Sequence, residues 1–122
     1  MSRSLERAQG LLGQVVTVTI DRPMDSRHPE RGYVYPVNYG YVSGVIAPDG
    51  EELDAYLLGV DQPVESADGV VRAVIHRRDD DDDKLVVIPK GVTLDDAEIK
   101  AAVDFQERFF VSEMVRAASK RD

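Results

Sequence analysis

Residues 35–54 read YPVNYGYVSGVIAPDGEELD, and this stretch determines how the rest of the sequence is interpreted. Three tyrosines, two turn signals and four carboxylates fall within it, a mixture that no amphipathic helix or strand requires. Pro36 fixes its own φ angle and favours an extended residue before it, and the asparagine and glycine that follow suit a sharp, irregular backbone. Asp49-Gly50 is a strong turn signal directly ahead of the acids. Because acids beside a tight turn suit an oxygen-liganded cation, we interpret the remaining chain as a scaffold for this segment.

The composition limits the class of protein. The chain has 122 residues, the usual size of one domain, and 43% of them are apolar, which is enough for a core. A formal net charge of -8 argues against nucleic acid as a partner, and a small anionic substrate would need a cation to bring it in. The absence of cysteine excludes disulfides and thiolate metal sites. Without a signal peptide or a run of ~18 apolar residues, we expect a soluble, cytoplasmic protein that does not bind membranes.

Strand patterns lie within residues 35–54 and on both sides of them. Apolar alternation and short apolar runs predict five strands: Gln14–Ile20, Tyr41–Ile46, Leu53–Val60, Val70–His76 and Lys84–Ile88. The middle of Leu53–Val60 is apolar on both faces, which suits a central position in a closed or covered sheet. Residues 65–69 are expected to form a turn. The weakly patterned residues 1–13 are expected to form an N-terminal arm.

The periodicity changes near Thr93. Thr93-Leu94-Asp95-Asp96 resembles a capping box with Asp in place of Glu, and the residues from Leu94 to about Ala118 favour a helix whose apolar stripe should cover the sheet. Strands followed by one long helix or two predict an α+β fold, mainly β, in which a small β-barrel or highly curved sheet carries a C-terminal helical layer. With no internal repeat and no linker, residues 1–122 are expected to form a single domain.

Two groups of acids could bind a cation. Asp49, Glu51 and Asp54 are so close in sequence that they repel one another unless a cation or protons intervene, although a solvated acidic turn would look the same. Five aspartates at 79–83 would ordinarily form a solvated, mobile loop. Because this run lies between two predicted strands, its ends are held, and it could offer one or two carboxylates to the same site.

A third group could bind an anion. It consists of basic side chains and tyrosine hydroxyls, each of which is more often a surface charge or a half-buried aromatic: Arg22, Arg27, Arg31, Lys84, Tyr35, Tyr39 and Tyr41. Arginine can hold phosphate oxygens with two hydrogen bonds, whereas lysine acts as a point charge. Together the groups suggest Mg²⁺-type sites that face a phosphate. Two such ions could neutralise a diphosphate and generate hydroxide from a bound water.

The motifs at 35–41 and 49–54, with KLVVIP at 84–89, resemble those of the soluble family I inorganic pyrophosphatases. The resemblance covers roughly residues 16–89, with a weaker echo at Phe105 to Phe110. It implies an OB-like β-barrel with flanking helices, dependence on Mg²⁺ and hydrolysis of inorganic diphosphate to two phosphates. It also implies a homo-oligomer.

The resemblance assigns roles residue by residue. Metal-binding carboxylates of the family fall on Asp49, Asp54 and Asp82, and a further one falls near Asp79. Glu51 replaces an Asp that orients or deprotonates the attacking water, so Glu51 and Asp54 are the expected catalytic residues. The expected phosphate-binding groups are Arg27, Tyr39 and Lys84.

The sequence also departs from the family pattern. Polar groups of the family fall on Thr17, Thr19, Phe109 and Phe110, so half of the expected phosphate clamp is missing. Arg22, Arg31 or His28 could substitute for it. Three readings follow, in order of preference. They are a Mg²⁺-dependent pyrophosphatase, a related phosphohydrolase for a larger phosphoanhydride or ester, and a non-catalytic module that binds metal or phosphate.

Overall fold

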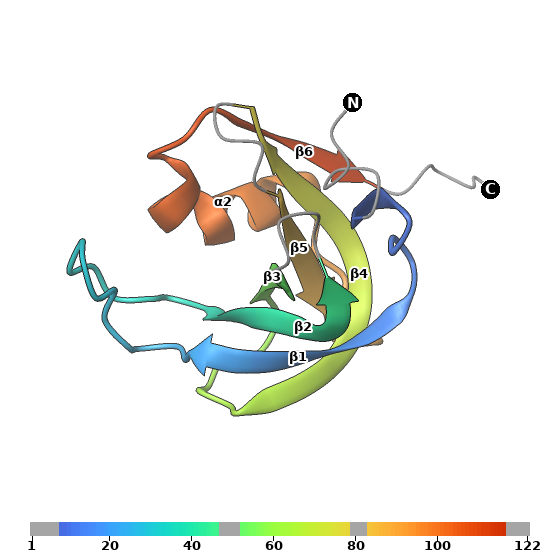
Figure 1. Ribbon diagram of the computed structural model, residues 1–122, viewed down its shortest axis with the longest axis horizontal. Helices are drawn as coiled ribbons and strands as arrows, with labels where there is room; N and C mark the ends of the chain where they lie inside the picture. Colours follow the sequence, from blue (N-terminus) through green and yellow to red (C-terminus); the bar gives the residue numbers. More distant parts are fainter. Residues whose placement is uncertain (1–7, 47–51, 79–82, 117–122) are drawn as a thin grey trace.

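The computed structural model describes residues 8–46, 52–78 and 83–116, and every structural statement below concerns these residues. Six strands and a helix follow one another along the chain (Figure 1). They are β1 (Val15–Arg22), β2 (Asn38–Ile46), β3 (Glu52–Leu57), β4 (Ser66–Arg77), β5 (Asp83–Ile88), α2 (Asp96–Glu107) and β6 (Ser112–Arg116).

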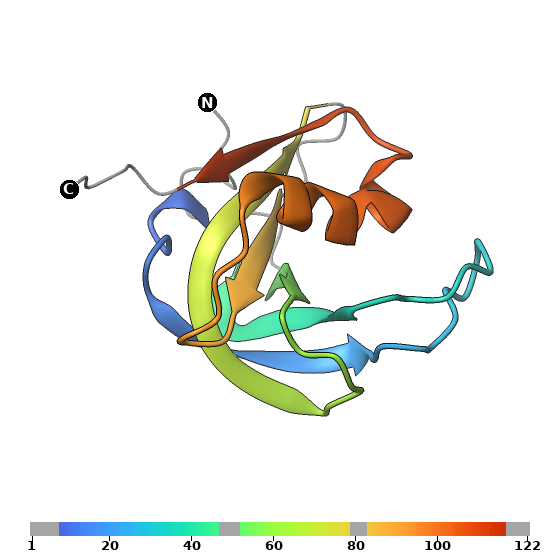
Figure 2. The same ribbon diagram turned by 180° about the vertical axis from the view of Figure 1, so that it is seen from behind.

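The sheet closes on itself to form a barrel. Its strand order is β1-β2-β3-β5-β4-β6, and an additional pairing of β1 with β4 closes the first five of these strands into a ring. The neighbours β3 and β5 are parallel, whereas the other pairs are antiparallel. Figures 1 and 2 show α2 lying against one side of the barrel, next to β6. This confirms the predicted OB-like α+β barrel with a C-terminal helix.

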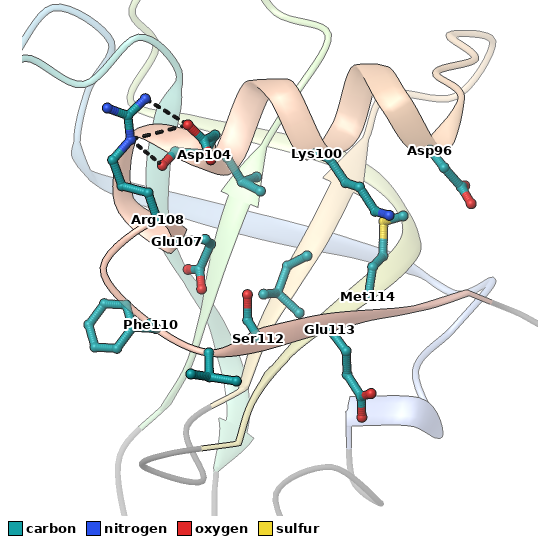
Figure 3. Close-up of a pocket in the computed structure, with 12 residues that line it drawn as sticks. Asp96, Lys100, Asp104, Glu107, Arg108, Phe110, Ser112, Glu113 and Met114 are labelled. Atoms are coloured by element: carbon teal, nitrogen blue, oxygen red, sulfur yellow. Dashed lines mark hydrogen bonds and ion pairs between the residues drawn. The ribbon is translucent and has the colours of Figure 1, made fainter.

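The C-terminal helix is shorter than the sequence predicted. It was expected to run from Leu94 to about Ala118, but α2 ends at Glu107 and the chain returns as β6, alongside the helix (Figure 3). The reason is tertiary: β6 hydrogen-bonds to the edge of β4, with Met114 opposite Ile75. This pairing outweighs a helix propensity that is only a weak preference. The helix start also differs, because the capping box consists of Asp95 and Glu98.

The strand β4 is longer at its start than predicted. Residues 66–69, expected within a turn, belong to β4 and pair with β1, with Gly69 opposite Val16. Gly69 is required by close packing rather than by a turn, since a Cβ atom there would lie 2.7 Å from Cγ1 of Val87. In the N-terminal segment, Ala8 is fully buried in the barrel core, so the described part of that segment packs on the barrel.

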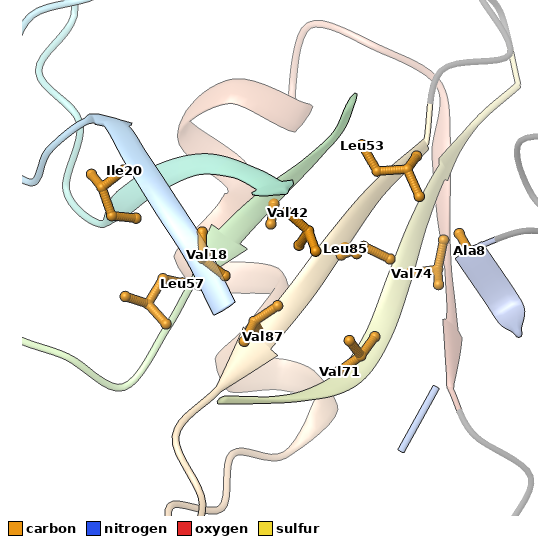
Figure 4. Packing of buried hydrophobic residues seen from close by; sticks show 11 residues of the cluster. Ala8, Val18, Ile20, Val42, Leu53, Leu57, Val71, Val74, Leu85 and Val87 are labelled. Carbon is orange, nitrogen blue, oxygen red and sulfur yellow. The ribbon is translucent and has the colours of Figure 1, made fainter. Parts of the chain in front are cut away.

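The core has two parts, separated by the sheet. Inside the barrel, apolar side chains from all five of its strands and from Ala8 pack together (Figure 4). On the other face, α2 buries Ile99 and Val103 against the barrel wall. Strand β5 supplies both parts, with Leu85 inside the barrel and Val86 beneath the helix. Burial on both faces explains the unbroken apolar run, and each such side chain contributes about 1.5–3 kcal/mol.

Across the described ranges, no helix is both long and apolar enough to cross a membrane.

Candidate active site

A cavity of about 390 Å³, here called the Asp54 cavity, lies where several strand ends meet the last turn of α2. The ends of β1, β4 and α2, the loop that joins β1 to β2, and the starts of β2 and β5 all contribute, together with the middle of β3. Its lining is rich in acids, cations and aromatic rings: Asp21, Arg22, His28, Glu30, Arg31, Tyr33, Tyr35, Tyr39, Asp54, Arg77, Lys84, Gln106 and Phe110.

Asp54, Lys84 and Tyr39 form the centre of one wall. Asp54 and Lys84 are register partners on the parallel strands β3 and β5, and Lys84 Nζ lies 2.7 Å from Oδ2 of Asp54. The hydroxyl of Tyr39 donates to the same oxygen at 3.1 Å. Burial, and then the charge of Asp54, raises the pKa of Tyr39 well above its ordinary value, so the phenol remains a neutral donor. These three residues, predicted from separate motifs, are therefore in contact.

Asn38 shows why the tyrosine motif folds as it does. Its side chain is fully buried, accepts a hydrogen bond from the backbone N–H of Met24 at 2.9 Å and donates to the carbonyl of Gln62 at 2.9 Å. It thereby ties the two loops that flank the start of β2. The next residue, Tyr39, is positioned by this arrangement, because alternate residues of a strand point to opposite faces.

Arg77, at the end of β4, is a residue of the cavity that the sequence analysis missed. Its guanidinium pairs with Glu107 of α2 through Nε at 3.1 Å and Nη2 at 2.8 Å, and both side chains are buried. The hydroxyl of Tyr56 donates to the same carboxylate at 2.6 Å. The ring of Phe110 covers the guanidinium at 3.7 Å. A signal was present in the sequence, since Arg77 continues the alternation of the buried residues Ala73 and Ile75.

Three tyrosine hydroxyls contact the side chain of Gln106, which lines the cavity. Oε1 of Gln106 accepts from Tyr33 at 2.8 Å and from Tyr35 at 3.3 Å, while its Nε2 donates to Tyr56 at 2.8 Å. Burial raises the pKa of Tyr35 to about 12, and burial likewise raises the pKa of Tyr33 and Tyr56. The phenols therefore stay protonated and neutral at neutral pH, and their single O–H donors are engaged with Gln106 and Glu107.

Some of the other predicted anion-binding residues line the Asp54 cavity, and others do not. Arg22, Arg31 and His28, the suggested substitutes for the missing clamp, all line the Asp54 cavity. Arg27 is not among the described lining residues, because its Nη1 donates to the carbonyl of Gly32 at 2.6 Å within the loop. Tyr41 is not in this lining either.

Of the residues that depart from the family pattern, only Phe110 is among the described lining residues of the cavity. The hydroxyl of Thr17 donates to Asp68 at 2.6 Å in an exposed pair, and neither Thr17 nor Thr19 is among the described lining residues. Phe110 lines the cavity, whereas Phe109 is 47% exposed and stacks on Tyr33 with ring centroids 6.0 Å apart.

Most of the predicted metal ligands lie outside the described residues. These are Asp49, Asp79 and Asp82, and the same holds for the proposed water-orienting residue Glu51. The strands that follow these two acidic segments, β3 and β5, are parallel neighbours, so both begin at the same end of the barrel. At the start of β5, Asp83 is buried, and its Oδ1 accepts a hydrogen bond from Nδ1 of His76 at 2.6 Å. Its Oδ2 has no hydrogen-bond partner among the described residues.

The described carboxylates fit part of a magnesium site. Asp21 and Asp54 line the same cavity, and the pKa of Asp21 is raised, first by burial and further by the charge of Asp54, against the opposing effect of Arg22. Two mutually repelling carboxylates suit Mg²⁺, which usually takes one or two carboxylates together with substrate phosphates. Within the described ranges, no group of three or more histidine or acidic side chains could hold a metal ion. The ligand set would therefore have to be completed by the substrate or by the acids outside those ranges.

The closed mixed barrel, the single helix packed against it and the cavity at the strand ends define an OB-like α+β barrel. No protein-family model and no curated protein sequence matches the chain. Its fold is nevertheless that of solved inorganic pyrophosphatases. The structure from Ehrlichia chaffeensis matches with a TM-score of 0.70 at 16% identity, over 87% of this chain and 88% of that chain.

Two further solved structures match in the same way. The inorganic pyrophosphatase from Neisseria gonorrhoeae has a TM-score of 0.62 at 19% identity, over 85% of this chain and 83% of that chain. The one from Coxiella burnetii has a TM-score of 0.58 at 18% identity, over 82% and 83%. At these identities the likeness concerns the fold, and the activity has to be argued from the site.

Proposed function

We propose that this protein hydrolyses inorganic diphosphate to two phosphates in the Asp54 cavity, in a reaction that depends on Mg²⁺. The observation that carries the proposal is the contact of Asp54, Lys84 and Tyr39 within one cavity that also contains several arginines. The motifs around these residues resemble those of pyrophosphatases. Independently, the fold resembles solved proteins of that name.

In the proposed reaction, the cationic and phenolic side chains bind the substrate. Arg22, Arg31 and Lys84 would attract and orient the phosphate oxygens, and Tyr39 would donate to them once its present acceptor, Asp54, binds the metal. Mg²⁺ held by Asp54, together with Asp49, Asp79 and Asp82, would neutralise the diphosphate and lower the pKa of a bound water. Glu51 would orient the attacking water and accept its proton. The water oxygen forms a new bond to one phosphorus as the bond from that phosphorus to the bridging oxygen breaks.

The direct test is phosphate release from diphosphate over a range of Mg²⁺ and Mn²⁺ concentrations. Asp54→Asn should lower the rate on the order of a hundredfold, since it removes a charge at the reacting centre. Asp104→Asn is the matched control, because Asp104 lies on the exposed face of α2 and pairs there with Arg108. No release above background by the wild-type protein would refute the proposal.

A larger substrate is the second candidate, and the aromatic side of the cavity favours it. His28 and Tyr33 both line the cavity, with ring centroids 4.8 Å apart, and Phe110 lies in the same lining. Such rings could contact a flat organic group attached to a phosphoanhydride. A substrate panel decides between the two candidates, because diphosphate as the best substrate would exclude the larger one. Binding of Mg²⁺ or phosphate without turnover would instead indicate a non-catalytic module.

We further propose that residues 1–122 form one domain and that the protein is a cytoplasmic homo-oligomer. The acidic, cysteine-free composition supports a cytoplasmic location, and the resemblance implies the oligomer. Light scattering coupled to size-exclusion chromatography tests the assembly, since a monomeric mass at micromolar concentration would contradict it.

A further inference from the structure

Two arginines that are adjacent in the sequence form ion pairs, one buried and the other exposed to solvent. Arg77 pairs with Glu107, and their side chains are each only 6% exposed. Arg78 pairs with Glu113 at 2.6 Å, and these side chains are 62% and 43% exposed. Burying an ion pair has a large desolvation cost, and apolar residues of similar volume are often equally stable in its place. Stability therefore gives no reason for the first pair to be buried.

The buried pair stands between two cavities. Arg77 lines the Asp54 cavity, while Glu107 lines a groove of about 700 Å³ between α2 and β6, called here the α2–β6 groove. Phe110 lines both. Figure 3 shows Glu107 directed from the last turn of α2 towards this groove, with Phe110 on the chain that leads to β6. The guanidinium of Arg77 thus forms part of the wall that separates the two spaces.

The orientation of this guanidinium is fixed from several directions. Two of its nitrogens donate to Glu107, the ring of Phe110 covers one face, and Tyr56 holds the same carboxylate through its hydroxyl. Each of these contacts restricts the rotation of a long side chain that would otherwise lose considerable conformational entropy on binding a ligand. The bonds to Glu107 use two of the five N–H donors of the guanidinium, and a planar donor held in one orientation is suited to binding phosphate oxygens through its other N–H groups.

We infer that Arg77 is an oxyanion-binding residue of the Asp54 cavity and that Glu107 is its positioning residue. The inference rests on the proposed function in that the oxyanion is a phosphate group of the substrate. Arg77 then takes over the task of the clamp that Thr17, Thr19 and the two phenylalanines do not supply. Its ligand is a phosphate or diphosphate oxygen, and the reacting bond lies towards Asp54.

The test measures binding rather than turnover. Methylene diphosphonate, which cannot be hydrolysed at its bridging carbon, is titrated into the protein by calorimetry, with and without Mg²⁺. The double variant Arg77→Met/Glu107→Leu removes both charges of the buried pair, so neither partner is left unpaired in the core. The matched control, Arg78→Met/Glu113→Leu, makes the same chemical change at the exposed pair.

The double variant should bind the diphosphonate about tenfold to a hundredfold more weakly than the wild type, because hydrogen bonds between charged groups are lost. The control should bind as the wild type does. Arg77→Lys, which keeps the charge and loses the planar fork, should show a loss of roughly threefold to tenfold, and it is the deciding variant if the double variant does not fold.

The outcomes separate the inference from the proposed function. A folded double variant, or a folded Arg77→Lys variant, that binds within twofold of the wild type overturns the inference, even if the wild type hydrolyses diphosphate. A wild type that neither binds the diphosphonate nor releases phosphate overturns both. Weak binding by the Arg77 variants together with a wild type that binds but has no turnover supports the inference and refutes hydrolysis.

Discussion

Lys84 and Asp54 lie directly opposite each other on the two parallel strands of the barrel, with Nζ and Oδ2 2.7 Å apart. Lys84 is buried, whereas the side chain of Asp54 is 41% exposed, so the pair presents its carboxylate rather than its ammonium to the solvent. A substrate that enters the cavity therefore meets an acid whose charge is already partly compensated. This arrangement links the stability of the barrel to its site.

Asp54→Asn is expected to destabilise the protein as well as inactivate it. The buried ammonium of Lys84 loses one charged partner, but because Asp54 is partly exposed the cost should be only about 1 kcal/mol. Urea unfolding measures the change. Asp104→Asn, at an exposed pair on α2, should leave the midpoint nearly unchanged. A larger loss of stability in the Asp104 variant would contradict this account of the Asp54 pair.

Tyr56→Phe is expected to cost about 1–3 kcal/mol of stability, because it leaves buried partners unsatisfied. Tyr56 is fully buried, and its hydroxyl both donates to Glu107 and accepts from Gln106. Tyr33→Phe, which removes one hydroxyl from a less buried position, should cost less. Thermal unfolding of both variants measures the two losses of stability. Equal losses would show that the hydrogen bond from Tyr56 to Glu107 stabilises the protein no more than the bond from Tyr33 to Gln106 does.

Gly40→Ala is expected to prevent the barrel from forming, or to destabilise it by about 3 kcal/mol or more, since overpacking at backbone cannot relax. A Cβ atom at Gly40 would overlap the carbonyl oxygen of Thr19 on β1. Gly91→Ala is the control: its φ is +90°, but nothing lies within 4 Å of the added atom. That control should cost about 1 kcal/mol of backbone strain. Circular dichroism and urea unfolding distinguish the two, and a well-folded, stable Gly40→Ala variant would contradict the observed packing of β1 on β2.

Asp21→Asn is expected to raise the unfolding midpoint at pH 7. The pKa of Asp21 is raised above its ordinary value of 3.8, chiefly by burial, so the folded protein holds this proton more tightly than the unfolded chain does. Stability is therefore lost as the pH rises from 3.8 through the raised pKa, and the loss is complete at neutral pH. The gain from the variant should disappear below pH 3.8.

Thermal unfolding across this pH range tests that expectation. The exposed Asp61→Asn serves as the control for removing one negative charge from an acidic protein. A gain for Asp21→Asn that persisted unchanged in acid would mean that the carboxylate is not penalised by its surroundings.

The parts of the fold that the sequence revealed are those where local pattern and tertiary burial agree. Leu85–Ile88 is a continuous apolar run because β5 is covered on both faces, and it was predicted as a buried strand. The motifs that carry Asp54, Lys84 and Tyr39 were expected to form one site, and the structure brings these three side chains together. In both cases the types of residue in the local sequence were sufficient for the prediction.

The parts that the sequence concealed depend on which partner a segment finds. Ser112–Arg116 fits a helix as well as a strand by local preference, and only the free edge of β4 selects the strand. Ser66–Gly69 has the composition of a turn but finds β1 as its partner. The partner of Arg77 could not be predicted from local pattern, because Glu107 lies thirty residues further along the chain and is brought to it by α2.

The pairing of Val15 with Val70, which closes the barrel, also has a consequence for when this protein can fold. Contacts between residues so distant in sequence must overcome the entropy of closing a long loop, which makes barrels of this kind slow to fold. During synthesis at about 5–20 residues per second, β1 would wait several seconds before β4 is made. Over that interval its Val-rich strand has an unpaired edge, and so the nascent chain is most exposed to aggregation before its fourth strand appears.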